Sequence, residues 1–208
     1  MSARPSDPRG APAGRGLRGD LVRAALGAAV VAVTWREALR PELPPWEGPA
    51  FDAVNHLPEG FRATWPVMQL GSFAAIPVVA LATARVTHDR ALAARVGAAG
   101  LGAYVGAKVI KARVGRGRPA VMRPGAILRE DARGLGYPSG HAAEAAAMAT
   151  VLASELPGPW RWAPQAVAVV VGLSRVYVGA HLPHDVIGGA ALGSAIGATT
   201  NAVARSVR

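Results

Sequence analysis

The chain has 208 residues, a length that suits one domain. Half of its residues (51%) are hydrophobic and only 5% are aromatic, so small aliphatic side chains supply the apolar content, as they do in closely packed membrane helices. The net charge of +10 would favour a nucleic-acid partner in a soluble protein. Here the basic residues lie between apolar stretches rather than in one stripe, so we expect a membrane protein with no nucleic-acid partner. The absence of cysteine excludes disulfides and thiolate ligands.

The N-terminal part of the chain predicts a tail and a first helix. Residues 1–19 are rich in Pro, Gly, Ser and Arg, a composition that cannot build a core. We therefore expect a disordered basic tail, followed by a membrane-embedded domain over residues 20–208. The apolar run Leu21–Trp35 is predicted to form the first membrane helix. Residues 36–62 form a polar, Pro-rich connection, with a short amphipathic helix expected around Phe51–Leu57.

Five further apolar runs follow, and each is near the length of about 20 residues that crosses a bilayer. They span Thr64–Thr83, Ala91–Ile110, Ser139–Leu156, Ala163–Val178 and Val186–Val203. Gly, Pro or a charged residue interrupts several of them. Together with the first helix they predict an all-α fold, a bundle of six transmembrane helices in a multi-pass protein of the cell membrane.

The short loops predict the orientation of this bundle. With a cytoplasmic N-terminus, the Arg-rich tail, the ARVTHDR and LPGPWRW turns and the C-terminal end all face the cytoplasm. These segments are net basic or neutral, as the positive-inside rule requires, and both termini are then cytoplasmic. The dense basic run Lys111–Arg133 faces the outer side instead. An anion-binding site at the outer face would explain this exception.

Three polar clusters fall at that outer face in the six-helix arrangement: KARVGRGRP (111–119), YPSGH (137–141) and SRVYVGAHLPHD (174–185). In the first cluster, glycines and a proline make further regular helix unfavourable after Lys111. Lys111 and Arg118 can then turn inward as cationic donors to a phosphate group. The alternative is a basic juxtamembrane stretch that meets lipid headgroups.

The second cluster predicts the start of a helix. Ser139 is a good N-cap, and Gly140 lets a ligand approach the backbone, where free N–H groups form a ready anion site. His141 would then lie in the first turn, beside the bound anion. An ordinary capped helix with a surface histidine is the alternative.

The third cluster pairs a histidine with a carboxylate. Asp185 follows His181 by four residues, a spacing that lets the carboxylate hold one ring nitrogen protonated and leave the other as a nucleophile. Arg175 precedes His181 by six residues. The neighbouring His184 fits this role less well by its spacing, and we place it at the rim of the site. The alternative is a buried Arg–Asp–His network with a structural role.

A metal site is the competing interpretation of these residues. The four candidate ligands would be His141, His181, His184 and Asp185. The surrounding lysine and arginines would oppose a cation, however, and the sequence contains no His-x-x-x-His or Asp-rich ligand set. We therefore expect no metal and no other cofactor.

The order and spacing of the three clusters resembles the signature of the type-2 phosphatidic acid phosphatase superfamily. That signature reads Lys, six residues, Arg-Pro; then Pro-Ser-Gly-His; then Ser-Arg, five residues, His, three residues, Asp, and every position is occupied here. The resemblance spans about Lys108–Gly189. The superfamily includes membrane lipid phosphatases, bacterial undecaprenyl-diphosphate phosphatases and soluble vanadium haloperoxidases.

The resemblance implies metal-independent hydrolysis of a lipid phosphate or diphosphate through a phosphohistidine intermediate. It implies that His181 is the nucleophile, oriented by Asp185, and that His141 protonates the leaving oxygen and then activates water. The phosphate-binding set it implies is Lys111, Arg118, Ser139, Gly140 and Arg175. Candidate substrates are a polyprenyl diphosphate, phosphatidic acid, phosphatidylglycerophosphate or a polyprenyl-phospho-sugar. The alternatives are a vanadate-dependent haloperoxidase, against which the membrane runs argue, and a non-catalytic lipid-binding membrane protein.

Overall fold

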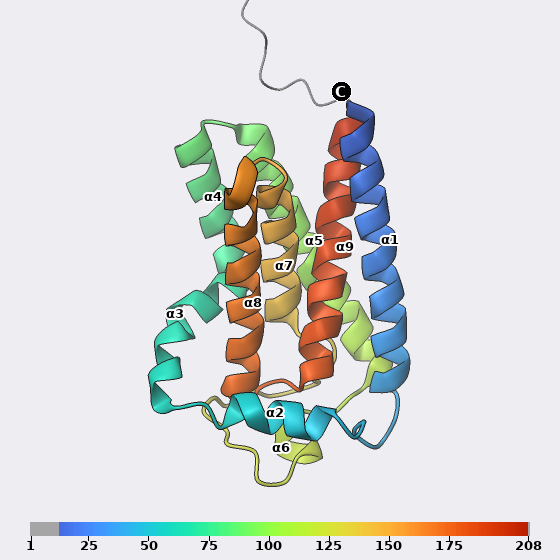
Figure 1. Cartoon of the computed structure of the whole chain (residues 1–208), viewed down its shortest axis with the longest axis vertical. Helices are drawn as coiled ribbons and strands as arrows, with labels where there is room; N and C mark the ends of the chain where they lie inside the picture. Colours follow the sequence, from blue (N-terminus) through green and yellow to red (C-terminus); the bar gives the residue numbers. More distant parts are fainter. Residues whose placement is uncertain (1–12, 208) are drawn as a thin grey trace, which may run out of the picture.

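The computed structural model describes the backbone of residues 13–207 and the side chains of residues 16–207. This part of the chain is helical throughout, with no strand in it (Figure 1). The helices are α1 (Ala13–Ala38), α2 (Glu47–Asn55), α3 (Trp65–Met68), α4 (Ala75–Thr87), α5 (Arg90–Val114), α6 (Pro119–Met122), α7 (Gly140–Ala153), α8 (Trp162–Tyr177) and α9 (Pro183–Ser206), with short 3-10 segments η1 (Glu59–Thr64), η2 (Gln69–Gly71) and η3 (Gly158–Arg161). The predicted all-α fold is confirmed.

The long helices form one bundle with α7 at its centre. Residues 142–151 of α7 are all buried between α5, α8 and α9, which is possible because most of them are alanine. On α9, a stripe of glycines lies against α7, and a Cβ added at Gly193 would come 2.0 Å from the carbonyl oxygen of Ala143. Small residues on both helices therefore allow the two backbones to touch, as they do in membrane bundles.

The two ends of the bundle contain different elements. Helices α2 and α6 lie across one end of the bundle (Figure 1). Helices α1, α5 and α8 have their last residues there, and α7 and α9 have their first. We call this the α2 end. The opposite end contains the α4–α5 turn, η3 and the C-terminal part of α9. Every residue that the sequence analysis assigns to the site lies at or near the α2 end.

Helix α1 begins earlier than the sequence suggested. It starts at Ala13 rather than Leu21, so residues 13–19 belong to the helix and the expectation of a disordered tail is wrong for them. The carboxylate of Asp20 accepts a hydrogen bond from Arg205 of α9 at 2.9 Å, which fixes this end of α1 to the C-terminal helix. Residues 1–12, the rest of the expected tail, lie outside the described part of the chain.

The apolar run Thr64–Thr83 is not one helix, contrary to the prediction. It is divided into η1, α3, η2 and α4, with a bend of 81° between the segment Glu59–Gly71 and α4. Gly71 packs so closely on α7 that an added Cβ would lie 2.5 Å from the carbonyl oxygen of His141. Ser72 then adopts an extended conformation and ends the helical path. Hydropathy cannot reveal this break because the residues on both sides are apolar.

Length and hydropathy do not establish six membrane spans. Within residues 13–207, α9 is the single helix that is long and apolar enough to cross a membrane alone, and the bent segment Glu59–Thr87 would add a second span. The predicted fourth and fifth spans correspond to α7 and α8, which have 14 and 16 residues. Both are shorter than the roughly 20 residues that a bilayer requires.

The connection between α1 and the rest of the bundle contains the expected short helix, shifted to Glu47–Asn55. Glu47, Phe51 and Asn55 recur every four residues and are all buried. The side-chain amide of Asn55 donates to the carbonyls of Ile127 (2.9 Å) and Tyr177 (3.0 Å), and its oxygen accepts from the backbone N–H of Ile127 at 2.8 Å. Helix α2 is thus fixed across the α2 end of the bundle, directly over the site.

Candidate active site

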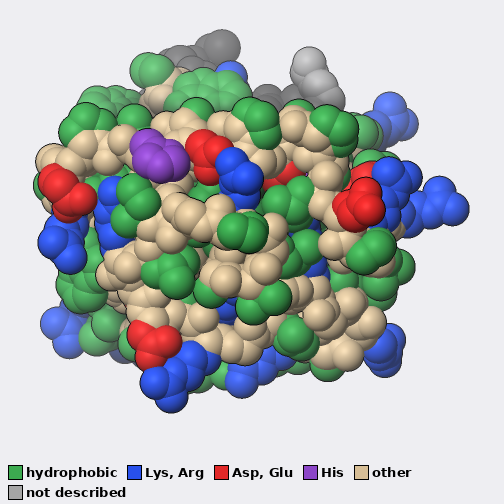
Figure 2. Space-filling view, turned by 90° about the horizontal axis from the view of Figure 1, so that it is seen from below, with side chains coloured by type: hydrophobic (Ala, Val, Ile, Leu, Met, Phe, Trp, Pro, Cys, Tyr) green, Lys and Arg blue, Asp and Glu red, His purple; other side chains and the backbone are tan. Residues whose placement is uncertain are grey.

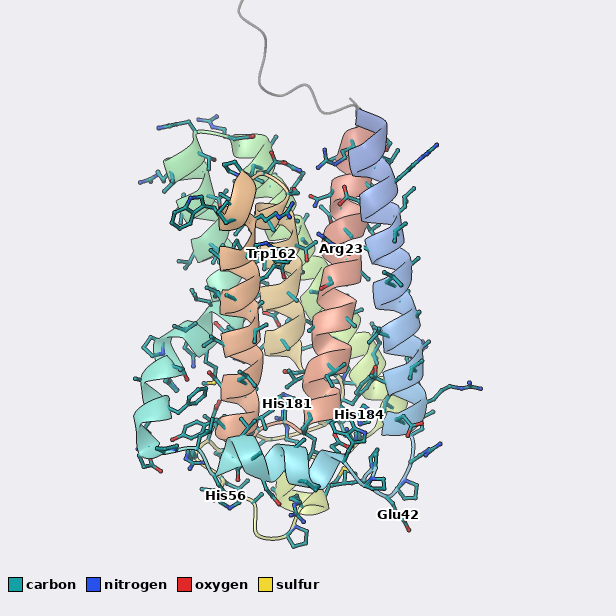
Figure 3. The ribbon with its side chains drawn as sticks, viewed as in Figure 1. Arg23, Glu42, His56, Trp162, His181 and His184 are labelled. Atoms are coloured by element: carbon teal, nitrogen blue, oxygen red, sulfur yellow. The ribbon has the colours of Figure 1, made fainter. Side chains whose placement is uncertain are left out.

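The three polar clusters of the sequence meet at the α2 end. Lys111 lies in the last turn of α5, and the segment with Ser139 opens α7. His181 lies in the loop that joins α8 to α9, and Figure 3 places it at the lower end of the bundle, above α2. Residues that are up to 70 positions apart in sequence therefore surround one small volume.

His181 and Asp185 form a buried pair. Nδ1 of His181 lies 3.4 Å from Oδ2 of Asp185, and the two side chains are 3% and 0% exposed. The same carboxylate oxygen accepts the backbone N–H of Leu182 at 3.0 Å, which fixes it at the start of α9. The start of α9 therefore holds the Asp185 carboxylate in its orientation toward the imidazole of His181.

Arg118 determines which nitrogen of His181 carries the proton. Its Nη1 donates to the carbonyl of Ala180 at 2.7 Å and lies 3.5 Å from Nε2 of His181. Because a guanidinium has only donors, Nε2 must present its lone pair, and the proton of the neutral ring belongs on Nδ1, facing Asp185. Burial, followed by the positive charges of Lys111 and Arg118, holds the pKa of His181 well below its ordinary value of 6.5. The ring is consequently a neutral imidazole with a lone pair on Nε2.

Two more cations of the signature lie close to His181. Nζ of Lys111 donates to the carbonyls of Leu135 (2.9 Å) and Gly136 (3.0 Å). Arg175 is 3% exposed and donates to the carboxylate of Glu130 at 2.7 Å. The positive charges of both side chains contribute to the low pKa of His181, as the charge of Arg118 does, so all three cations lie around the same imidazole. Such a set of donors around a neutral histidine suits an oxyanion.

The second cluster contributes the start of α7. Ser139 is its N-cap, and the serine oxygen accepts the N–H of Ala142 at 3.4 Å. The backbone N–H of Ser139 donates to the carbonyl of Asp185 at 2.8 Å, which joins the start of α7 to the start of α9. His141 follows in the first turn, half-buried. Among the described side chains it makes no hydrogen bond, so both ring nitrogens are available to a ligand.

Two site residues were missed by the sequence analysis, Arg116 and Glu47. Arg116 is 4% exposed, and its Nη1 donates to Oδ1 of Asp185 at 2.9 Å. Its Nη2 donates to Glu47 at 2.6 Å, so one guanidinium bridges two fully buried carboxylates. Arg116 lies in the same basic cluster as Arg118, but nothing in the spacing distinguishes it. Glu47 comes from the connection before the signature, so only the three-dimensional contact reveals it.

The position predicted for His184 is wrong. It is 6% exposed rather than at the rim, because α2 covers it. Its backbone N–H donates to Glu47 at 2.9 Å, and its ring lies 4.8 Å from the ring of Trp46. Burial raises the pKa of Glu47, but the hydrogen bonds from His184 and Arg116 outweigh it and leave that pKa below its ordinary value. Glu47 is therefore a buried anion that holds both neighbours in place.

The site opens toward the surface of the α2 end. A cleft of about 350 Å³ lies there, lined by Arg118 and by residues 128–132 of the loop that precedes α7. Figure 2 views this face, where backbone and apolar side chains cover much of the centre and both basic and acidic side chains lie around it. Within the described side chains, no group of three or more His, Asp or Glu residues is placed to hold a metal ion.

The fold and the site together define a class: a helical bundle with a buried His–Asp pair among basic side chains at one end. The sequence profile of the PAP2 superfamily matches residues 92–207, more than half of the chain and all three signature clusters. The chain belongs to the PAP2 superfamily.

Individual proteins agree with this assignment. An undecaprenyl-diphosphatase from Sulfolobus acidocaldarius is 42% identical over 74 residues, a stretch that covers 35% of this chain and 35% of that protein. The crystal structure of Aquifex aeolicus LpxE is similar with a TM-score of 0.71 and 22% identity, covering 77% of this chain and 97% of that one. A transmembrane PAP2-type phosphatidylglycerolphosphate phosphatase from Bacillus subtilis is similar with a TM-score of 0.54 and 21% identity, covering 94% and 97% of the two chains. The two structural likenesses concern the fold.

Proposed function

We propose that this protein hydrolyses a lipid phosphate monoester or diphosphate through a phosphohistidine intermediate, without a metal ion. One observation carries the proposal: the neutral ring of His181 is fixed by Asp185 on one side and presents its other nitrogen to a ring of cations. This is the arrangement that nucleophilic attack on a phosphoryl group requires.

The residues divide the reaction into two displacements. Lys111, Arg118 and Arg175, with the first N–H groups of α7, hold the phosphoryl oxygens. Nε2 of His181 attacks phosphorus, the bond from phosphorus to the leaving oxygen breaks, and His141 gives that oxygen a proton. His141 then takes a proton from water, whose oxygen attacks the phosphohistidine. Phosphate leaves and His181 returns to its neutral state.

A lipid substrate is supported by an apolar groove of about 330 Å³ along α7. Its lining includes Leu70, Met148, Leu152 and Val167, with almost no polar surface. Leu70 precedes Gly71, the residue that packs on the backbone of His141, so the groove begins beside the site. An acyl or prenyl tail can lie along it while the phosphate reaches His181. The undecaprenyl-diphosphatase that matches part of this chain makes a polyprenyl diphosphate the first substrate to test.

The surface of α1 supports a membrane location. Leu21, Leu26 and Val33 are 55%, 63% and 62% exposed, a lipid-facing rather than a water-facing arrangement. We propose that residues 20–208 form one membrane-embedded domain. In that domain α1, the bent segment Glu59–Thr87, α5, α7, α8 and α9 cross the bilayer, both termini are cytoplasmic and the site faces outward.

Phosphate release in detergent tests the function. The panel contains undecaprenyl diphosphate, phosphatidic acid and phosphatidylglycerophosphate, each with purified wild type, His181→Ala and His56→Ala. His56 is an exposed histidine at the same end of the bundle, so its variant should match wild type. We expect His181→Ala to lose turnover entirely, and wild-type turnover in this variant would refute the nucleophile. Activity removed by EDTA and restored by Mg²⁺ would refute the metal-free mechanism.

A further inference from the structure

A second cleft lies at the end of the bundle opposite the site. It has a volume of about 760 Å³ and lies between α1, α7, α8 and α9. Its polar and aromatic lining consists chiefly of Arg23, Ser154, Arg161, Trp162, Gln165 and Ser194. Figure 3 places Arg23 and Trp162 far from His181, in the upper half of the view. The cleft therefore has no part in the chemistry proposed above.

The space lies where α8 and α9 diverge. Helix α9 packs closely on both α1 and α7, and α8 packs on α7, whereas α8 and α9 contact each other much less. Small residues, among them Gly19, Ala153 and Ser194, line this space. A cavity of this size matches a ligand of drug-like size, well above a single ion.

The charges of the cleft favour an anion. Neither Arg23 nor Arg161 has a carboxylate partner among the described side chains, and the one acid in the lining, Asp20, is paired with Arg205 at 2.9 Å. Arg161 lies over the ring of Trp162, 5.2 Å from its centroid. Thr150 also lines the cleft, is 1% exposed, and its hydroxyl lacks a hydrogen-bond partner in the described structure. Two guanidinium groups without a carboxylate partner therefore line one hollow, together with the hydroxyl or amide side chains of Thr150, Gln165 and Ser194. The Ser154 hydroxyl donates to the carbonyl of Val151 at 2.8 Å, and its oxygen can still accept a hydrogen bond.

We infer that this cleft binds the headgroup of an anionic phospholipid, with the phosphodiester on the two arginines and the headgroup hydroxyls on the serine and glutamine side chains. The inference rests on the membrane placement in the proposed function, which puts this end of the bundle at the cytoplasmic headgroup level. Basic pockets between membrane helices on that side bind anionic lipids, and tryptophan is typical of that depth. Guanidinium forks match phosphate oxygens.

The experiment compares lipid retention in three proteins. They are wild type, the cleft variant Arg23→Gln/Arg161→Gln, and the control Arg85→Gln/Arg90→Gln, which removes the same charge from the α4–α5 turn at the same end. Each is extracted from nanodiscs of phosphatidylglycerol and phosphatidylcholine, and bound lipid is counted by native mass spectrometry. Phosphatidylglycerol is a phosphodiester, so a monoester phosphatase does not consume it. Inorganic phosphate serves as a soluble competitor.

Wild type and control should retain phosphatidylglycerol over phosphatidylcholine, and the cleft variant should lose about fivefold in retention for each arginine. Equal retention by the cleft variant, or equal loss by the control, would overturn the inference. Displacement of the lipid by millimolar inorganic phosphate would assign the cleft to free phosphate and also overturn it.

A second variant guards against a folding defect. Gly19→Leu leaves both arginines in place and adds a side chain where nothing lies within 4 Å of the new Cβ, so it narrows the cleft without a clash. It should lower retention while phosphate release stays at the wild-type rate, and unchanged retention would count against the cleft. Because retention needs no turnover, a protein that binds lipid here but hydrolyses none would refute the proposed function alone.

Discussion

Asp185 accepts hydrogen bonds on both carboxylate oxygens, and Arg116 donates to the oxygen that does not face His181. The guanidinium lies 2.9 Å from Oδ1, while Oδ2 meets the imidazole. Without Arg116, a fully buried carboxylate would lose its only ion-pair partner in the described structure other than the histidine itself. A positive charge at this point therefore keeps Asp185 ionised and directed at His181.

We expect Arg116→Gln to lower kcat about 100-fold, the effect of misplacing a catalytic group by roughly 1 Å, with KM changed little because Lys111, Arg118 and Arg175 remain. Arg116→Lys should restore part of the loss. Steady-state kinetics below the melting temperature of each variant measure both constants. The matched control is Arg113→Gln, an exposed arginine in the last turn of α5, which should match wild type. A rise in KM with an unchanged kcat would instead assign Arg116 to substrate binding.

The protonation of His181 predicts the acid limb of the pH profile. Since burial and nearby cations lower its pKa, the free enzyme keeps the neutral, nucleophilic ring at pH 6.5 and loses it only as the pH falls further. The acid limb of kcat/KM should therefore have its midpoint below 6.5 once the substrate's own ionisation, near pH 6, has been corrected for. A midpoint at or above 6.5 would mean that the ring is not held neutral.

At the scale of the elements, hydropathy located most helices but not their breaks. The runs Ala91–Ile110 and Val186–Val203 lie inside α5 and α9, because a continuous apolar face is enough to predict a packed helix. The break after Gly71 depends on its contact with α7, and the burial of Glu47 depends on Arg116, 69 residues away. Such contacts have no local signature. The signature residues could be predicted because their spacing within each cluster is local.

Helix α8 offers a test of the tail groove. Val167 lines the groove and is 38% exposed, whereas Val169 is 60% exposed and lies outside it. Val167→Trp should exclude part of a lipid tail. The loss of two methylene contacts, at about 0.8 kcal/mol each, would raise KM for a long-chain substrate about 15-fold. Val169→Trp should leave it unchanged.

A water-soluble short-chain phosphate ester serves as the reference substrate for both tryptophan variants. It does not occupy the groove, so its kcat and KM should be the same in Val167→Trp and in wild type. An equal loss toward the short and the long substrate would indicate that the tryptophan disturbs the site rather than the groove. Wild-type KM for the long substrate would show that the tail lies elsewhere.

At the scale of the whole molecule, the chain places different chemistry at its two ends. The α2 end contains the site and the long basic loop, and the opposite end contains the second cleft and the short turns (Figure 1). The six crossings proposed above separate these two ends, and they include α7 and α8, which have 14 and 16 residues and are short for a full span. Local thinning of the bilayer around short helices accommodates such a mismatch.

Cysteine labelling can test the orientation cleanly, because the native chain has no cysteine. Val121, in α6 at the α2 end, and Val86, in α4 at the opposite end, are both 80% exposed and form a matched pair. In intact spheroplasts, an impermeant maleimide should label Val121→Cys and not Val86→Cys, and permeabilisation should expose both. This follows from the positive-inside rule, which places the short basic loops in the cytoplasm. The reverse pattern would place the site in the cytoplasm, where the positive-inside rule alone would explain the basic loop. Labelling of both variants in intact spheroplasts would contradict a membrane between the two ends.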